Sequence, residues 1–174
     1  SADGAFMIRL LDERFRLNIG IAEMERYAAQ LGSDCPFFIT AEPSFATGRG
    51  ELLEPADGPK GNLDGYYIAV VKPDEAVSTA MAYKQIKCHK PAKCCRDVVR
   101  QPIDTWKDDL SNDFEEPVFK AHPRLASIKQ QLYDLGAVYA QMSGSGSALF
   151  GIFRKEPTNI DEIFSDCFTF TSVL

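Results

Sequence analysis

Apolar residues return every three or four positions in two long stretches of the chain, 21–31 and 124–135. This spacing places them on one face of a helix, so an amphipathic helix is predicted for each stretch. Gly32 and Gly136 stand directly after these stretches, where helices commonly end. Shorter helices are predicted at residues 5–11, about 79–86, 98–107, 112–119 and 160–164.

Strands are predicted where β-branched and aromatic residues run together. The continuous apolar run 66–71 is typical of a buried strand. Segments 138–142 and 148–153 flank a glycine-rich turn and predict an antiparallel pair. Further strands are predicted at residues 37–40, 44–47 and 167–171. Helices mixed with antiparallel strands indicate an α+β fold.

A stretch rich in Gly, Pro, Asp and Asn interrupts these patterns at residues 56–65. Such residues favour turns over regular structure, so we interpret the stretch as a linker. The chain is therefore expected to divide into two domains, residues 1–62 and 63–174.

The amino-acid composition argues against some classes of binding partner. Of the 174 residues, 45% are hydrophobic and 25% charged, which is ordinary for a globular protein. Acidic residues outnumber basic ones, 25 to 19, and the formal charge of −6 argues against a nucleic-acid partner. No apolar run approaches the length of a membrane span, and no signal-peptide pattern is visible in the first residues of the sequence. A membrane partner is therefore not expected.

The five cysteines are odd in number and show no regular framework. We interpret them as reduced thiols, which favours a cytoplasmic location. Cys88-His89 together with Cys94-Cys95 suggests zinc, but the spacing fits no common zinc pattern. We therefore predict a loop over residues 87–96 and no tightly bound metal site.

The tract Ser143-Gly144-Ser145-Gly146-Ser147 lies between the two strands of the predicted antiparallel pair. Glycines allow positive φ angles and close approach of a ligand to the backbone. Consecutive N–H groups in such a turn can hold an anion. The tract therefore indicates a phosphate-binding loop, with a flexible turn as the alternative.

Asp34 stands between a predicted helix end and the apolar Pro36-Phe37-Phe38. One interpretation is an Asx turn or a cap. The other is a carboxylate at the edge of a cleft, which can orient a hydroxyl and accept its proton in phosphoryl transfer.

Five stretches, taken in order, resemble the 4-diphosphocytidyl-2-C-methyl-D-erythritol kinase family of the GHMP kinase superfamily. They are Ser1–Ala5, Leu31–Phe38, Ala46–Glu51, Lys72-Pro73 with Val77–Tyr83, and Ser111–Glu115 followed by Met142–Ser147. The resemblance implies a remnant of the GHMP N-terminal ATP-binding domain and a complete ferredoxin-like α/β-sandwich C-terminal domain. Family members begin with a further segment that holds the catalytic lysine and most of a glycine loop, so this chain alone is expected to be inactive.

The resemblance also implies roles for individual residues. Asp34 aligns with the catalytic aspartate that activates the substrate hydroxyl. Residues expected to line the ATP phosphates are Ser1, Ala2, Asp3, Ser143, Gly144, Ser145 and Gly146. The alternative for Ser1 is a helix N-cap and nothing more.

Thr79 and Tyr83 fall where the family contacts the cytidine part of its substrate, and an aromatic ring at 83 can stack on cytosine. The alternative for both is packing within the helix core. Gly48 and Gly50 are expected to shape a tight turn near the substrate sugar, while the role of Arg49 is open. Neither histidine, His89 or His122, is assigned to catalysis.

The implied activity is ATP-dependent, Mg²⁺-assisted phosphorylation of the 2-hydroxyl of 4-diphosphocytidyl-2-C-methyl-D-erythritol, in the non-mevalonate route to isoprenoid precursors. Partners would be this small molecule and ATP, with a homodimer left open. The alternatives are another GHMP kinase, of the mevalonate or homoserine type, and a non-catalytic α+β binding module.

Overall fold

A computed structural model describes residues 1–56, 63–86 and 91–174. The chain divides into two compact units, Ser1–Lys60 (unit 1) and Gly61–Leu174 (unit 2). Part of the predicted linker lies outside the described residues. No helix in the described ranges is long and apolar enough to cross a bilayer.

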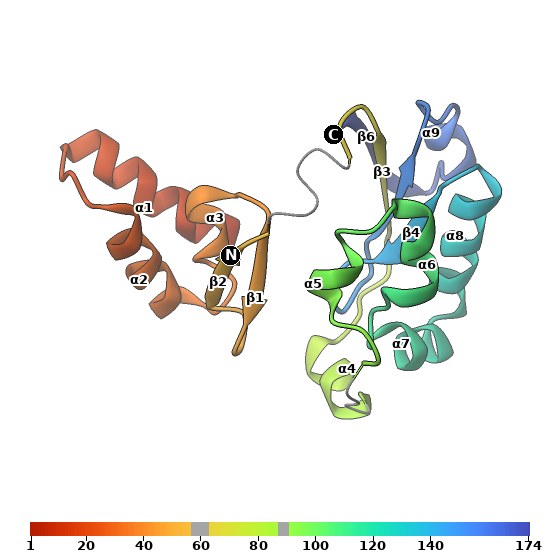
Figure 1. The fold of residues 1–174 in the computed structure, drawn as a ribbon, viewed down its shortest axis with the longest axis horizontal. Helices are drawn as coiled ribbons and strands as arrows, with labels where there is room; N and C mark the ends of the chain where they lie inside the picture. The colour runs from red at the N-terminus through yellow and green to blue at the C-terminus, as the bar shows by residue number, and fades with distance from the viewer. Residues whose placement is uncertain (57–62, 87–90) are drawn as a thin grey trace. The chain divides into compact units, whose positions relative to one another are not determined.

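Unit 1 consists of three helices and a two-stranded sheet (Figure 1). The elements are α1 (Ala2–Phe15), α2 (Ile21–Leu31), α3 (Phe37–Thr40), β1 (Ser44–Thr47) and β2 (Leu52–Pro55). The two strands pair antiparallel, with Ser44 opposite Pro55 and Thr47 opposite Leu52. The prediction of α2 is confirmed, whereas α1 is longer than the apolar pattern indicated.

Small side chains form the core of unit 1. Ala5, Ala28, Cys35 and Ile39 are all buried and contact one another. At Gly4 an added Cβ would come 3.2 Å from Leu31 Cδ1, so the beginning of α1 packs closely on the end of α2. Several large apolar side chains of α1 stay exposed: Phe6, Met7, Leu10, Leu11 and Phe15.

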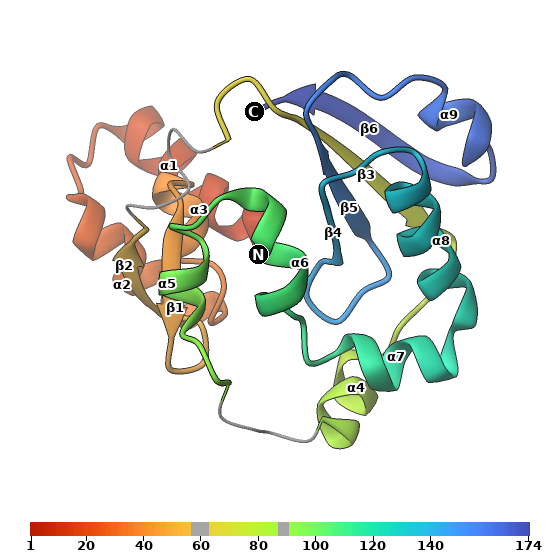
Figure 2. The ribbon, with the colours of Figure 1, turned by 45° about the vertical axis from the view of Figure 1, so that its right-hand side comes forward.

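Unit 2 is built on a four-stranded antiparallel sheet of order β4-β5-β3-β6. The strands are β3 (Tyr67–Pro73), β4 (Tyr139–Met142), β5 (Leu149–Phe153) and β6 (Cys167–Val173). Pairing of β4 with β5 through Met142 and Leu149 confirms the predicted hairpin around the glycine-serine tract. Figure 2 shows that the turn of this hairpin lies at the same end of the sheet as α7.

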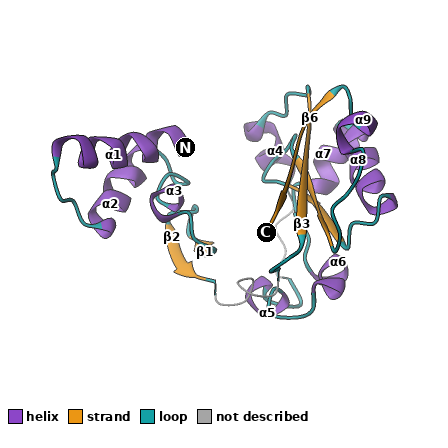
Figure 3. Cartoon of the chain, turned by 90° about the horizontal axis from the view of Figure 1, so that it is seen from above, coloured by secondary structure: helices purple, strands orange, loops and turns teal. Residues whose placement is uncertain are grey.

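Helices cover both faces of this sheet. They are α4 (Thr79–Gln85), α5 (Cys95–Val98), α6 (Trp106–Asp109), α7 (Glu115–Ala121), α8 (Pro123–Asp134) and α9 (Ile160–Ile163), with a 3₁₀ turn, η1 (Ile103–Thr105). Figure 3 shows α8 and α9 together on one side of the strands.

The side chains of β4 and β5 alternate between two buried clusters, as the pleat of a strand requires. Ala69 and Val71 of β3 pack against α8, whose Leu125, Ile128 and Leu132 fill the larger cluster. On the opposite face, the smaller cluster brings together the buried side chains Val98, Ile103, Trp106, Tyr139 and Ile152. The periodicity of residues 124–135 therefore predicted a helix whose apolar face is buried against the sheet.

The predicted strand at 37–40 is wrong, because these residues form α3. Pro36 adopts helical angles, φ −54° and ψ −39°, and its carbonyl accepts the N–H of Ile39. The preceding turn thus starts a helix, which overrides the β-propensity of the aromatic pair. The strand β2 was not predicted.

The predicted helix at 98–107 is interrupted, since α5 ends at Val98 and Pro102, which has no N–H to donate, begins the 3₁₀ turn. Trp106 is buried, as expected for a packing residue. The helix predicted from 112 begins only at Glu115. Of the predicted loop 87–96, residues 87–90 lie outside the described ranges and Cys95 already belongs to α5.

Candidate functional site

The residues predicted for the site divide between the two units. Ser1, Ala2, Asp3, Asp34, Gly48 and Gly50 belong to unit 1, and Thr79, Tyr83 and Ser143–Gly146 belong to unit 2. The structure therefore gives two groups of candidate residues, each with its own geometry.

Asp34 lies in the turn between α2 and α3 with its side chain exposed. Its neighbour Cys35 is buried in the core of unit 1, and this anchors the turn. A Cβ added at Gly50 would lie 2.9 Å from Asp34 Oδ1, so the backbone of the β1–β2 turn runs directly beside the carboxylate. Asp34 and Gly50, both predicted site residues, therefore lie side by side. Because they are well separated in the sequence, no local pattern predicted this proximity.

Gly48 and Gly50 both adopt positive φ angles, +70° and +113°. The N–H of Gly50 donates to the carbonyl of Thr47, which closes the tight turn expected here. Glu51 supports the turn from the other side: its carboxylate accepts the Arg49 N–H at 2.7 Å. Hydrogen bonds from the backbone N–H groups of Glu51 and Arg49 lower the pKa of this carboxyl, so it remains charged in neutral solution.

Ser1 is the N-cap of α1, but its side chain makes no capping hydrogen bond. Asp3 is an acid in the first turn, where the helix dipole favours it. The packing of Gly4 on Leu31 brings this helix start close to the turn that carries Asp34. The first N–H groups of a helix have no partner within the helix and suit anionic oxygens.

The loop between β4 and β5, residues 143–148, carries the second group and is called the phosphate loop after the role predicted from its sequence. Two hydrogen bonds close it: Ser143 N–H donates to Ala148 O, and Gly146 N–H donates to Ser143 O. Gly144 and Gly146 have φ angles of +55° and +89°. Within the described ranges, the N–H groups of Gly144 and Ser145 have no acceptor. Two consecutive free donors in a glycine turn can hold an anion.

Thr79 joins the first turn of α4 to this loop. Its hydroxyl oxygen lies 3.0 Å from the hydroxyl oxygen of Ser145, and either can be the donor. Ser78 caps the helix by accepting the Met81 N–H at 3.4 Å. The predicted substrate residue Thr79 and the predicted phosphate residue Ser145 are therefore neighbours.

Tyr83, one turn further along α4, is 66% exposed, so it is not a core residue of the unit. Its ring meets Phe114 edge to face, with the centroids 5.0 Å apart and the planes at 88°. This contact holds the ring on one side, while most of the residue remains exposed.

Two residues that hold the phosphate loop were not assigned to the site from the sequence. Asn112 donates from Nδ2 to the carbonyls of Met142 and Gly144, and Glu115 accepts the N–H of Met142. Both belong to a stretch that carried the family resemblance, which was the available signal. Local pattern alone did not reveal contacts that span about thirty residues of chain.

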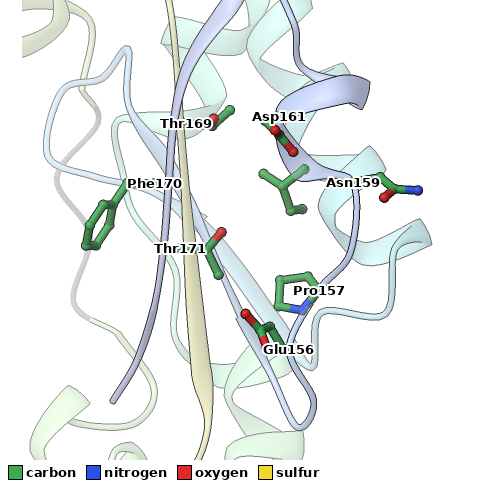
Figure 4. A pocket seen from close by; sticks show the side chains of 8 residues that line it. Glu156, Pro157, Asn159, Asp161, Thr169, Phe170 and Thr171 are labelled. Carbon is green, nitrogen blue, oxygen red and sulfur yellow. The ribbon is translucent and has the colours of Figure 1, made fainter.

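A cavity of about 310 Å³ lies elsewhere in unit 2, between β6 and the segment that leads into α9 (Figure 4). Glu156, Asp161, Thr169 and Thr171 are among its lining residues. None of the predicted site residues lines it, and its two carboxylates oppose the binding of a phosphate.

Candidate metal ligands do not gather in the described ranges, where no group of three or more His, Cys, Asp or Glu side chains is placed to hold an ion. Cys94 and Cys95 are exposed free thiols. Cys88 and His89, the other half of the zinc pattern considered, lie outside the described residues.

Comparison with known proteins identifies relatives of this chain. Residues 96–167 match the family described as GHMP kinases C terminal. A 4-diphosphocytidyl-2-C-methyl-D-erythritol kinase of Bacteroides fragilis is 45% identical over 174 residues, which is 100% of this chain and 62% of the relative. The enzyme of that name from Parabacteroides distasonis is 47% identical over 170 residues, 97% of this chain and 61% of the relative. The chain thus spans less than two thirds of these relatives.

Solved structures share the fold. A crystal structure of 4-(cytidine 5'-diphospho)-2C-methyl-D-erythritol kinase superposes with a TM-score of 0.78 at 22% identity, over 96% of this chain and 61% of that one. Homoserine kinase from Cytophaga hutchinsonii superposes with a TM-score of 0.59 at 10% identity, over 93% and 60% of the two chains. The α+β fold is shared with these structures, and residues 96–167 form a GHMP kinase C-terminal domain.

Proposed function

We propose that the protein carrying this chain transfers the γ-phosphate of ATP to the 2-hydroxyl of 4-diphosphocytidyl-2-C-methyl-D-erythritol. The observation that carries the proposal is the 45% identity, over the whole of the chain, to a curated relative of that name. The geometry of both units supports it, because each presents groups that phosphoryl transfer requires.

Asp34 is proposed as the general base. Its carboxylate is exposed at a turn anchored by buried Cys35 and bordered by the Gly50 backbone, so it is accessible and held in place. A positioned carboxylate can orient the attacking hydroxyl and accept its proton as the bond to phosphorus forms. Phosphoryl transfer depends mainly on such positioning and on charge stabilisation.

The phosphate loop and the first turn of α1 are each proposed as a phosphate-binding element. The free N–H groups of Gly144 and Ser145 supply two donors, and the first turn at Ser1–Asp3 supplies the positive end of a helix dipole. Mg²⁺ would enter on the nucleotide oxygens, where it neutralises charge that develops during transfer.

Thr79 and Tyr83 are proposed to bind the cytidine end of the substrate. The Tyr83 ring is exposed and fixed by Phe114, and Thr79 brings a hydroxyl next to Ser145. Gly48 and Gly50 would shape the turn beside the sugar. This assignment fits a nucleotide-linked alcohol better than mevalonate or homoserine, which have no base to stack. A cytoplasmic location and a place in isoprenoid precursor synthesis belong to the same proposal.

The test is ATP consumption by the full-length protein with three substrates offered separately. They are 4-diphosphocytidyl-2-C-methyl-D-erythritol, mevalonate and homoserine. Turnover with the cytidine substrate alone is expected. Turnover with one of the others would move the assignment to a sister kinase, and no turnover would favour a non-catalytic binding module.

A further inference from the structure

Asn112 lies in the segment before α7 and uses its whole amide group on the backbone. Nδ2 donates to Met142 O at 2.8 Å and to Gly144 O at 2.7 Å. Oδ1 accepts the N–H of Phe114 at 2.9 Å. The Asn112 side chain therefore links the start of α7 to the last residue of β4, Met142, and to the second residue of the phosphate loop, Gly144.

Glu115 holds the same loop through a different atom. Its Oε1 accepts the N–H of Met142 at 2.8 Å, while Oε2 binds Lys129 Nζ of α8 at 2.6 Å. The exposed fractions of the Glu115 and Lys129 side chains are 14% and 23%, so this ion pair is largely shielded from water. The last residue of β4 is thus held at its N–H by Glu115 and at its carbonyl by Asn112.

The hydrogen bond from Asn112 to the Gly144 carbonyl fixes the orientation of the peptide between Gly144 and Ser145. In a trans peptide the carbonyl and the N–H point in opposite directions. The Gly144–Ser145 bond is not among the cis peptides of the described chain. Because Asn112 binds the Gly144 carbonyl, the N–H of Ser145 points away from Asn112, and it has no acceptor within the described residues.

We propose that Asn112 is a positioning residue that turns the peptide after Gly144 so that the Ser145 N–H faces an incoming phosphate oxygen. Without this amide, the peptide is free to flip and present its carbonyl oxygen, which repels an anion. The proposal rests on the proposed function in one respect, that the phosphate loop binds the nucleotide. Asn112 itself touches the loop backbone and not the reacting atoms.

The experiment compares Asn112→Asp with a matched control in the full-length protein. Asn112→Asp keeps the acceptor for Phe114 but faces two carbonyl oxygens with a carboxylate in place of a donor. The control is Asn159→Asp, since Asn159 is exposed, lies in the same unit and makes no capping hydrogen bond at α9. Both variants add one negative charge. The readouts are kcat, KM for ATP, KM for the alcohol and the unfolding midpoint.

We expect Asn112→Asp to raise KM for ATP about tenfold, the usual effect of one or two lost hydrogen bonds, and to leave KM for the alcohol within about twofold. A purely structural role would lower the amount of folded enzyme and leave both KM values alone. An unchanged KM for ATP, or an equal rise in Asn159→Asp, would overturn the proposal. If Asn112→Asp does not fold, Asn112→Ala takes its place, because it leaves the two carbonyls to water.

Failure of the proposed function is separable from failure of this inference. If the wild-type protein phosphorylates none of the three substrates, binding of inorganic triphosphate decides the role of Asn112. About tenfold weaker binding by Asn112→Asp than by the wild type and Asn159→Asp would support it. Equal affinities, or no binding by the wild type, would overturn it.

Discussion

At the residue scale, Asp34 is the exposed carboxylate on which the proposed chemistry of unit 1 depends. We expect Asp34→Asn to lower kcat by about a thousandfold, since a positioned base contributes roughly 10²–10⁴ to the rate. The side chain is exposed in its turn, so the unfolding midpoint should change little. Steady-state kinetics and thermal unfolding of the full-length variant check both points. Near-normal turnover would remove Asp34 from the mechanism.

Gly50 controls the space around Asp34. A Cβ at this position would lie 2.9 Å from Asp34 Oδ1, so Gly50→Ala should displace the carboxylate and lower kcat, by about a hundredfold if the shift reaches 1 Å. The φ angle of +113° adds strain of roughly 1–3 kcal/mol.

Gly65→Ala is the control for that strain. Gly65 has a φ angle of +79°, yet a Cβ there meets nothing within 4 Å. Both variants should lower the unfolding midpoint, and only Gly50→Ala should lower kcat. Equal kinetic losses in the two variants would show that strain, and not the contact with Asp34, is responsible.

Cys167, at the start of β6, has a raised thiol pKa. Desolvation is the main cause, and Asp166 adds a hydrogen bond and a negative charge. The thiolate is the reactive form, so at about pH 8 we expect iodoacetamide to modify Cys167 several-fold more slowly than the exposed Cys94 and Cys95. Peptide mass spectrometry over a time course measures the three rates.

The raised pKa of Cys167 also determines how the contribution of this thiol to stability changes with pH. A folded-state pKa above the unfolded value stabilises the fold below the unfolded pKa, and this contribution is lost as the pH rises through the folded pKa. Modification of Cys167 as fast as of Cys94 and Cys95 would contradict the raised pKa.

At the element scale, α8 carries the larger core of unit 2. Leu132 is fully buried there, and Leu132→Ala should lower the free energy of unfolding by about 2–5 kcal/mol. Gln131→Ala is the control, because Gln131 is the exposed neighbour on the same helix. Trp106, the single tryptophan, is buried in unit 2 and reports its unfolding by fluorescence in urea. Similar midpoints for both variants would contradict the assigned core.

The elements also show what the sequence could predict. The apolar faces of α2 and α8 follow from their spacing, and the β4–β5 hairpin follows from its apolar runs and glycines. The segment 37–40 was wrongly predicted as a strand, because Pro36 starts a helical turn there in spite of the aromatic residues. The contact between Asp34 and Gly50 depends on how two turns fold against each other, which no local pattern records.

At the scale of the whole molecule, each of the three buried clusters lies within one unit. The chain spans 62% of its Bacteroides fragilis relative, and the family's catalytic lysine is expected in the remaining part. We therefore expect the 174-residue chain alone to consume no ATP above background with the cytidine substrate, while Trp106 fluorescence still reports a folded unit 2. Measurable turnover by the chain alone would show that the groups described here suffice.

The hydrogen bonds of Asn112 also have a consequence for chemical ageing. Asparagine is a thermolabile residue, and deamidation would turn the amide at 112 into an acid. Attack on the side chain requires it to rotate, which its bonds to the carbonyls of Met142 and Gly144 oppose. Deamidation at 112 should therefore be slow, and stored preparations should lose affinity for ATP as it proceeds.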